Sequence, residues 1–135
     1  MKTKTQATIL LVEDDPGHAR LIQKNLRRQG INGAIVHVTD GQAAVDYLRC
    51  QGPYAAQTLP ESLLILLDLN LPILNGAQVL EHISAVPNLK DLPRIIITTS
   101  DEPEDMRSCA HFGYDDYVLK PLDYVDLAQK LEHLL

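Results

Sequence analysis

Short apolar runs alternate along the chain with longer segments in which apolar residues recur every three or four positions. The short runs end abruptly at polar residues and are too short for buried helices, so they are typical of buried strands. The strands that this pattern predicts are residues 7–12, 34–38, 63–67, 94–98 and 117–119. The longer segments predict helices that begin near Asp15-Pro16, Asp40-Gly41, Asn75-Gly76, Pro103 and Asp123.

The third predicted strand, residues 63–67, is apolar at every position. A strand without alternation is buried on both faces, as in a parallel sheet that helices cover. Strand-helix units in strict alternation favour an open, doubly wound α/β fold here, because a barrel would need about eight such units. We expect a flavodoxin-like, five-stranded parallel sheet of strand order 2-1-3-4-5, in one domain that spans residues 1–135.

Composition narrows the classes of function. The chain has 12 Lys and Arg residues against 18 Asp and Glu residues, which gives a net charge of −6. This negative charge would repel the phosphate backbone of a nucleic acid, so we expect no nucleic-acid partner. No apolar run approaches the roughly 20 residues of a membrane helix, and we expect a cytoplasmic protein without a membrane partner. Cys50 and Cys109 do not form a close metal-ligand pair, so both are expected to be reduced thiols.

Polar residues stand where the predicted strands end. Glu13 and Asp14 follow the first strand, Asp68 follows the third, Thr98 ends the fourth, and Lys120 follows the fifth. In a doubly wound sheet, ligands bind outside the carboxyl ends of the strands. We therefore expect three acids, a hydroxyl and an ammonium to meet in one crevice.

Carboxylates gathered in this way repel one another, and a hard divalent cation resolves the conflict. Mg2+ prefers oxygen ligands and usually shares a phosphate oxygen, and Asp14 and Asp68 suit it as ligands. Lys120 and Thr98 would then face the phosphoryl oxygens. The residues predict a site for phosphoryl transfer to a carboxylate.

Longer motifs carry a family resemblance. They are Ile9-Leu10-Leu11-Val12-Glu13-Asp14-Asp15, Asp40-Gly41, Leu66-Leu67-Asp68-Leu69-Asn70-Leu71-Pro72 with Asn75-Gly76, Thr98-Thr99-Ser100, and Gly113-Tyr114-Asp115-Asp116-Tyr117-Val118-Leu119-Lys120-Pro121. In this order and spacing, the sequence resembles the receiver domain of a two-component response regulator over nearly its whole length. The doubled Thr98-Thr99 and the Leu-Asp-Leu-Asn-Leu-Pro run are similar to small stand-alone regulators that partner cyanobacterial phytochrome-type kinases.

The resemblance implies a role for each residue of the site. Asp68 is expected to accept a phosphoryl group from the phosphohistidine of a histidine kinase, and Thr98 and Lys120 to bind that group. The Mg2+ ligands that it implies are Glu13, Asp14, Asp68 and the backbone carbonyl of Asn70. The longer arm of Glu13 is expected to reach the metal through water. The protein would be a phosphoryl acceptor that dephosphorylates itself, not a dedicated enzyme.

The resemblance also implies how a signal leaves the site. Tyr117 is the expected aromatic switch, whose ring leaves a solvent-facing rotamer when the Thr98 hydroxyl moves inward. Since only one helix is predicted after Lys120, we expect no output domain and an output through protein contacts. The expected partner face is the fourth helix, fifth strand and fifth helix, which could also form a homodimer. It offers Met106 for contact and three residues for salt bridges, namely Asp105, Arg107 and Lys130.

Two further expectations concern single residues. The Lys120-Pro121 bond is expected to be cis, as the resemblance suggests and X-Pro chemistry permits. The five histidines, His18, His37, His82, His111 and His133, show no ligand spacing and are expected to be ordinary surface or partly buried residues.

Three alternative functions compete with a phosphorylated receiver. A haloacid-dehalogenase-type phosphatase needs a second acid two residues after its nucleophile, where this chain has Asn70. A flavodoxin-like flavin carrier would need phosphate-binding Ser, Thr and Gly after the first strand, where acids stand here. A receiver that binds partners without phosphorylation stays open, although none of the expected acids, nor the lysine, is missing.

Overall fold

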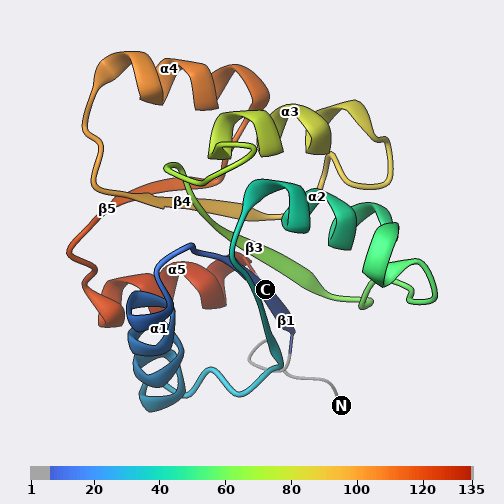
Figure 1. The fold of residues 1–135 in the computed structure, drawn as a ribbon. Coiled ribbons are helices and arrows are strands. Elements are labelled where there is room, and N and C mark those ends of the chain that lie inside the picture. The colour runs from blue at the N-terminus through green and yellow to red at the C-terminus, as the bar shows by residue number, and fades with distance from the viewer. Residues whose placement is uncertain (1–6, 135) are drawn as a thin grey trace.

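The apolar runs form the strands of one parallel sheet (Figure 1). The structure is a computed structural model, and it describes residues 7–134. The strands are β1 (Thr8–Val12), β2 (Ile35–Val38), β3 (Leu63–Asp68), β4 (Arg94–Thr98) and β5 (Asp116–Leu119). Their spatial order is β2-β1-β3-β4-β5, and each adjacent pair is parallel. The predicted fold class and strand order are confirmed.

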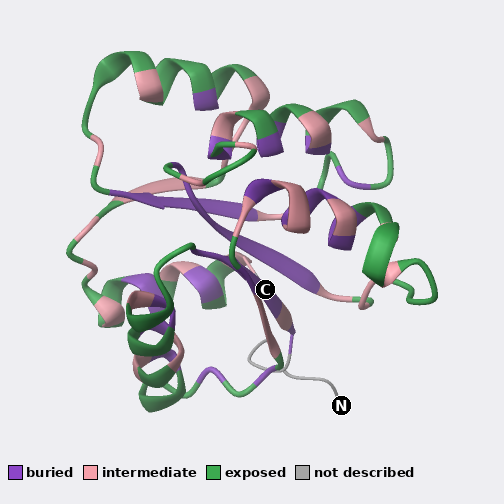
Figure 2. Cartoon of the chain, viewed as in Figure 1, coloured by how far each residue is buried: buried purple, intermediate pink, exposed green. Residues whose placement is uncertain are grey.

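Helices cover both faces of this sheet (Figure 1). They are α1 (Pro16–Arg28), α2 (Gly41–Arg49), the short 3-10 helix η2 (Gly52–Tyr54), α3 (Gly76–Ala85), α4 (Pro103–Phe112) and α5 (Tyr124–Leu134). The buried residues of α1 and α5 belong to one apolar cluster, and the buried residues of α2, α3 and α4 belong to a second one. Every residue of β3 is buried, which agrees with its unbroken apolar sequence (Figure 2).

The helix starts follow the capping chemistry of the sequence. The Asp15 carboxylate accepts hydrogen bonds from the amides of Gly17 and His18, ahead of Pro16 in the first turn of α1. Asp40 caps α2 in the same way. Asn75 and Gln78 form a reciprocal capping box at the start of α3. Each of these helices therefore begins directly after a loop that leaves the carboxyl edge of the sheet.

The two cysteines are free, and the chain shows no candidate membrane span in its described part. Cys109 is buried in α4 and Cys50 is half-buried after α2, and neither forms a disulfide. The expectation that both thiols are reduced stays a prediction. Within residues 7–134, no helix combines the length and apolar character that a bilayer crossing requires.

A tight contact between α2 and the loop after β3 gives a stability prediction. A Cβ added to Gly41 would lie 1.9 Å from the Leu74 carbonyl oxygen, too close for either backbone to stay in place. Gly41→Ala should therefore lower the free energy of unfolding by about 1–3 kcal/mol or more, as overpacking does. Urea denaturation followed by far-UV circular dichroism measures this loss.

Gly17→Ala is the matched control, because a Cβ there meets only the Asp15 carboxylate, at 3.4 Å. Alanine also favours a helix over glycine by about 1 kcal/mol. This variant should be as stable as the parent or more stable. Equal stabilities of Gly41→Ala and the parent would show that the contact with Leu74 does not constrain the loop.

Candidate functional site

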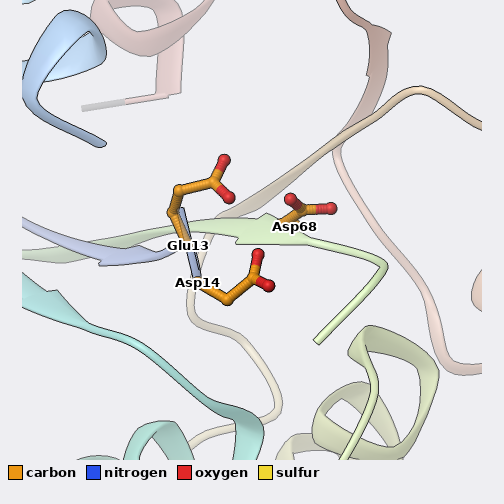
Figure 3. A group of neighbouring side chains, drawn as sticks. All are labelled: Glu13, Asp14 and Asp68. Atoms are coloured by element: carbon orange, nitrogen blue, oxygen red, sulfur yellow. The ribbon is translucent and has the colours of Figure 1, made fainter. Parts of the chain in front are cut away.

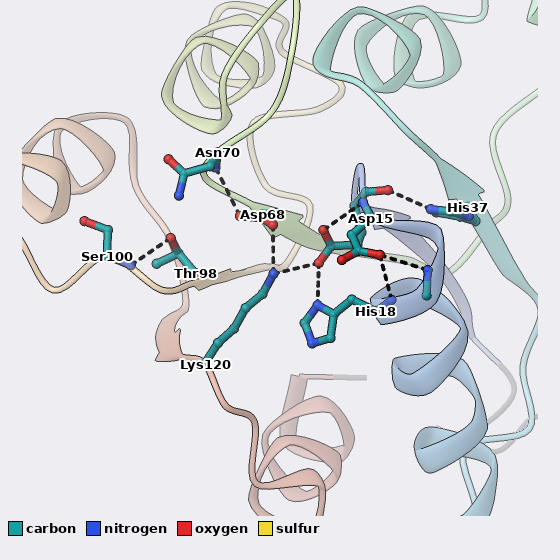
Figure 4. A network of polar contacts seen from close by, with 10 residues as sticks. Asp15, His18, His37, Asp68, Asn70, Thr98, Ser100 and Lys120 are labelled. Atoms are coloured by element: carbon teal, nitrogen blue, oxygen red, sulfur yellow. Dashed lines mark hydrogen bonds and ion pairs between the residues drawn. The ribbon is translucent and has the colours of Figure 1, made fainter.

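The carboxyl edge of the sheet brings the predicted polar residues together. Glu13 and Asp14 follow β1, and Asp68 is the last residue of the neighbouring strand β3. Thr98 ends β4 and Lys120 follows β5, so four adjacent strands contribute to one site (Figure 4). The sequence predicted that these residues meet at this edge of the sheet.

Three carboxylates form the centre of the site (Figure 3). One oxygen each of Glu13, Asp14 and Asp68 can be chosen so that all lie within 4.8 Å of one another. Glu13 and Asp68 are buried, with 1% and 4% of their surface exposed, whereas Asp14 is exposed. Like charges at this spacing favour a cation between them.

Lys120 supplies one positive charge to the two buried acids. Its ammonium donates to Glu13 Oε1 at 2.7 Å and to Asp68 Oδ2 at 2.9 Å (Figure 4). The Lys120-Pro121 peptide bond is cis, as predicted. The second Asp68 oxygen, Oδ1, accepts a hydrogen bond from the backbone N–H of Asn70 at 3.0 Å. One ammonium thus serves two buried carboxylates.

The two buried carboxyl groups differ in how well their charge is compensated. Burial raises the pKa of Asp68, and the neighbouring Glu13 charge adds to this effect, despite the hydrogen bonds from Lys120 and Asn70. Burial also acts to raise the pKa of Glu13, but hydrogen bonds from Lys120 and His18 outweigh it and lower that pKa to about 2. Asp68 is therefore the buried acid that gains more from a nearby cation.

Two histidines contact Glu13, and the sequence did not indicate either contact. His18 Nδ1 lies 2.8 Å from Glu13 Oε1, and His37 Nε2 lies 2.8 Å from the Glu13 carbonyl oxygen. Both residues are partly buried, as expected, but they also hold the acidic loop after β1. The His37 contact depends on the pairing of β2 with β1, which local spacing cannot reveal.

Thr98 and Tyr117 are joined through Ser100. Thr98 Oγ1 accepts a hydrogen bond from the Ser100 amide at 3.1 Å (Figure 4), and the Tyr117 hydroxyl donates to the Ser100 carbonyl at 2.9 Å. The Tyr117 ring is half-buried, and its centroid lies 5.6 Å from that of Tyr114. The expectation of a solvent-facing starting rotamer is wrong, because the phenol finds a backbone acceptor in the loop after β4.

The side chains expected to be available for salt bridges are largely engaged within the chain. Lys130 lies 3.1 Å from an Asp116 carboxylate oxygen and 3.6 Å from one of Asp126. The Asp105 carboxylate accepts a hydrogen bond from the Ser100 hydroxyl at 2.5 Å. In the described part of the chain only Arg107, among the three predicted, has no side-chain partner. The use of these three side chains in salt bridges with a partner stays a prediction.

Fold and site together define a doubly wound α/β protein with a lysine and a cluster of acids that could hold a cation, at the carboxyl edge of its sheet. The sequence model of the response regulator receiver domain matches residues 9–132. The chain therefore belongs to the response regulator receiver domain family.

Several members of this family resemble this chain over more than nine-tenths of its length. Response regulator Rcp1 of Synechocystis sp. is 36% identical over 124 residues, which are 92% of this chain and 83% of Rcp1. The phosphorylated cyanobacterial phytochrome response regulator RcpA superposes with a TM-score of 0.80 at 36% identity, covering 95% of this chain and 90% of that one. The bacteriophytochrome response regulator RtBRR gives a TM-score of 0.84 at 32% identity, covering 96% and 78%. The Mn2+-bound form of Rcp1 gives a TM-score of 0.79 at 35% identity, covering 94% and 90%.

Proposed function

We propose that this receiver domain acts as a stand-alone response regulator, which accepts a phosphoryl group on Asp68 from the phosphohistidine of a phytochrome-type histidine kinase. The observation that carries the proposal is the buried Asp68 carboxylate, which pairs with Lys120 and belongs to the acidic cluster at the carboxyl edge of the sheet. Likeness to RcpA and RtBRR supports a phytochrome-type partner. Such a kinase would place the reaction in the cytoplasm.

The donor set of the site fits Mg2+. Three carboxylates offer hard oxygen ligands, and the raised pKa of Asp68 reflects a charge in need of compensation. Asp14, Asp68 and the Asn70 carbonyl would hold the ion. Glu13 would act through water, because Lys120 and His18 already share one of its oxygens. When bound, Mg2+ neutralises the carboxylates and the incoming phosphoryl oxygens.

The chain's own groups would perform the transfer. An Asp68 oxygen attacks phosphorus, so that a P–O bond forms while the P–N bond to the donor histidine breaks. The Lys120 ammonium, now 2.9 Å from Asp68 Oδ2, would pair with the new phosphoryl oxygens. The Thr98 hydroxyl at the end of β4 would donate to another. Asn70 cannot act as a general acid, which separates this site from an Asp-nucleophile phosphatase.

Phosphoryl transfer from a kinase tests the proposed function. A bacteriophytochrome-type kinase is autophosphorylated with labelled ATP, freed of nucleotide, and mixed with the chain and Mg2+. The label should move from the kinase to the chain. Label that stays on every phytochrome-type kinase tried would favour a receiver that binds partners without phosphorylation.

The proposed output face consists of α4, β5 and α5. Three exposed large apolar residues lie on these elements, namely Met106, Leu119 and Val125, which are 37%, 47% and 52% exposed. Arg107 adds an uncommitted cation within the described residues. Such a face would bind a downstream protein or a second copy of the chain, whose contact would be self-complementary. Nucleic acid is not among the proposed partners, given the net charge of −6.

Thr98→Ala should separate phosphorylation from the switch. The variant should still bind Mg2+ and accept phosphate, because Asp68 and the acidic cluster are intact. Beryllofluoride, which mimics the phosphoryl group, should no longer shift the Tyr117 resonances. Moving a two-state equilibrium from 1:99 to 99:1 requires about 5.5 kcal/mol of binding energy that favours one state. This variant lacks the hydroxyl that would contact the phosphoryl group in only one of the two states. Nuclear magnetic resonance of labelled tyrosine measures the response.

Thr99→Ala is the control for this experiment, since Thr99 is an exposed neighbour with the same side chain. It should respond to beryllofluoride as the parent does. A parent-like Tyr117 response in Thr98→Ala would mean that the coupling runs by another route.

A further inference from the structure

Helix α4 begins without a side-chain cap from its own N-cap residue. In the described chain, Asp15, Asp40 and Asn75 cap α1, α2 and α3, and Asp123 accepts from the Asp126 amide at the start of α5. The N-cap residue of α4, Glu102, makes no such hydrogen bond. An uncapped helix end costs stability unless another group satisfies its amides.

Ser100, in the loop before α4, takes over this task. Its hydroxyl accepts a hydrogen bond from the Glu102 amide at 3.3 Å and donates to the Asp105 carboxylate at 2.5 Å. Asp105 lies in the first turn of α4, where a negative charge is favourable. The start of α4 is thus anchored to a residue of the site loop by a charge-assisted hydrogen bond.

The backbone of the same residue holds the two switch side chains. The Ser100 amide donates to Thr98 Oγ1 and its carbonyl accepts from the Tyr117 hydroxyl, at 3.1 and 2.9 Å. Three elements therefore share contacts with one residue: the end of β4, the aromatic ring on β5, and the first turn of α4.

We propose that Ser100 and Asp105 are a positioning pair that transmits phosphorylation from Thr98 to the start of α4. This inference rests on the proposed function. When the Thr98 hydroxyl turns toward a phosphoryl group on Asp68, its hydrogen bond with the Ser100 amide weakens and the loop shifts. Because the Ser100 hydroxyl is tied to Asp105, the shift is carried into α4.

Hydrogen exchange of the full chain tests this pair, with and without beryllofluoride and Mg2+. The reporters are the backbone amides of Met106 and Arg107. The Met106 amide donates to the Glu102 carbonyl in the first turn of α4. In the protein without beryllofluoride, Ser100→Ala and Asp105→Ala should speed the exchange of these amides about tenfold. Each variant loses one charge-assisted hydrogen bond, which lowers the free energy of local opening of α4. Asp105→Asn, which keeps an acceptor oxygen, should fall between these variants and the parent.

Two controls match the variants in place and chemistry. Glu104→Ala removes the neighbouring acid of the same helix turn, and Ser108→Ala removes a serine whose hydroxyl donates to the Glu104 carbonyl. Both should keep slow exchange at Met106 and a parent-like response to beryllofluoride. In Ser100→Ala and Asp105→Ala that response should vanish in α4 but persist in the segment around Asp68.

A parent-like α4 response in Ser100→Ala, or the same loss in both controls, would overturn the pairing. This failure is distinct from failure of the proposed function. In the latter case the parent itself would take up no phosphoryl group from acetyl phosphate at Asp68.

Discussion

Asp68→Asn should take up no phosphoryl group, while the parent takes up one. The amide has no nucleophilic carboxylate oxygen, although it keeps the shape of the side chain. The variant should not fail by unfolding: burial raises the pKa of Asp68, so at neutral pH its ionised form disfavours the fold, and removing the charge should leave the apo-protein at least as stable. Intact mass after incubation with acetyl phosphate and Mg2+ measures uptake, and thermal denaturation measures stability.

Asp15→Asn is the matched control for this loss. Asp15 is an exposed acid beside the site that caps α1, and Asn caps helices about as well as Asp. The variant should be labelled like the parent. Full labelling of Asp68→Asn, by contrast, would show that the acceptor is another residue.

Chelation of Mg2+ should abolish phosphorylation of the parent. A dianionic donor has to approach three clustered carboxylates, and among residues 7–134 Lys120 supplies the one cation that contacts both buried acids. Labelling with acetyl phosphate should therefore stop in EDTA and return when excess Mg2+ is added. Undiminished labelling in EDTA would show that the acidic cluster is not a required metal site.

The acids should differ in their contribution to Mg2+ affinity. Asp14 is exposed and free to ligate, whereas Glu13 is committed to Lys120 and His18. Loss of a residue that acts through water costs about 10–100-fold in metal affinity, and loss of a direct ligand should cost more. Calorimetric titration with Mg2+ should show a weaker affinity for Asp14→Ala than for Glu13→Ala. Equal losses would reject an indirect role for Glu13.

The sequence alone was sufficient for the fold and for the members of the acidic site. The unbroken apolar run of β3 required burial on both faces, and strict strand-helix alternation required a doubly wound sheet. In such a sheet the carboxyl ends of adjacent strands meet, so Glu13, Asp68 and Lys120 had to converge.

Contacts set by rotamers or by strand pairing could not be predicted. The hydrogen bond of His37 to the Glu13 carbonyl depends on the register of β2, and the bond of Tyr117 to Ser100 depends on one choice of side-chain rotamer. The Ser100–Asp105 contact could have been suspected, since an acid at the third position of a helix commonly reaches back to its start.

Peptide mapping of the phosphorylated chain identifies the residue that carries the phosphoryl group. The parent is incubated with acetyl phosphate and Mg2+, digested in acid to preserve the acyl phosphate, and sequenced by tandem mass spectrometry. One phosphoryl group is expected, on a peptide containing Asp68, and none when Mg2+ is withheld. A phosphoryl group on a peptide without Asp68, or an unmodified chain with Mg2+ present, would contradict it.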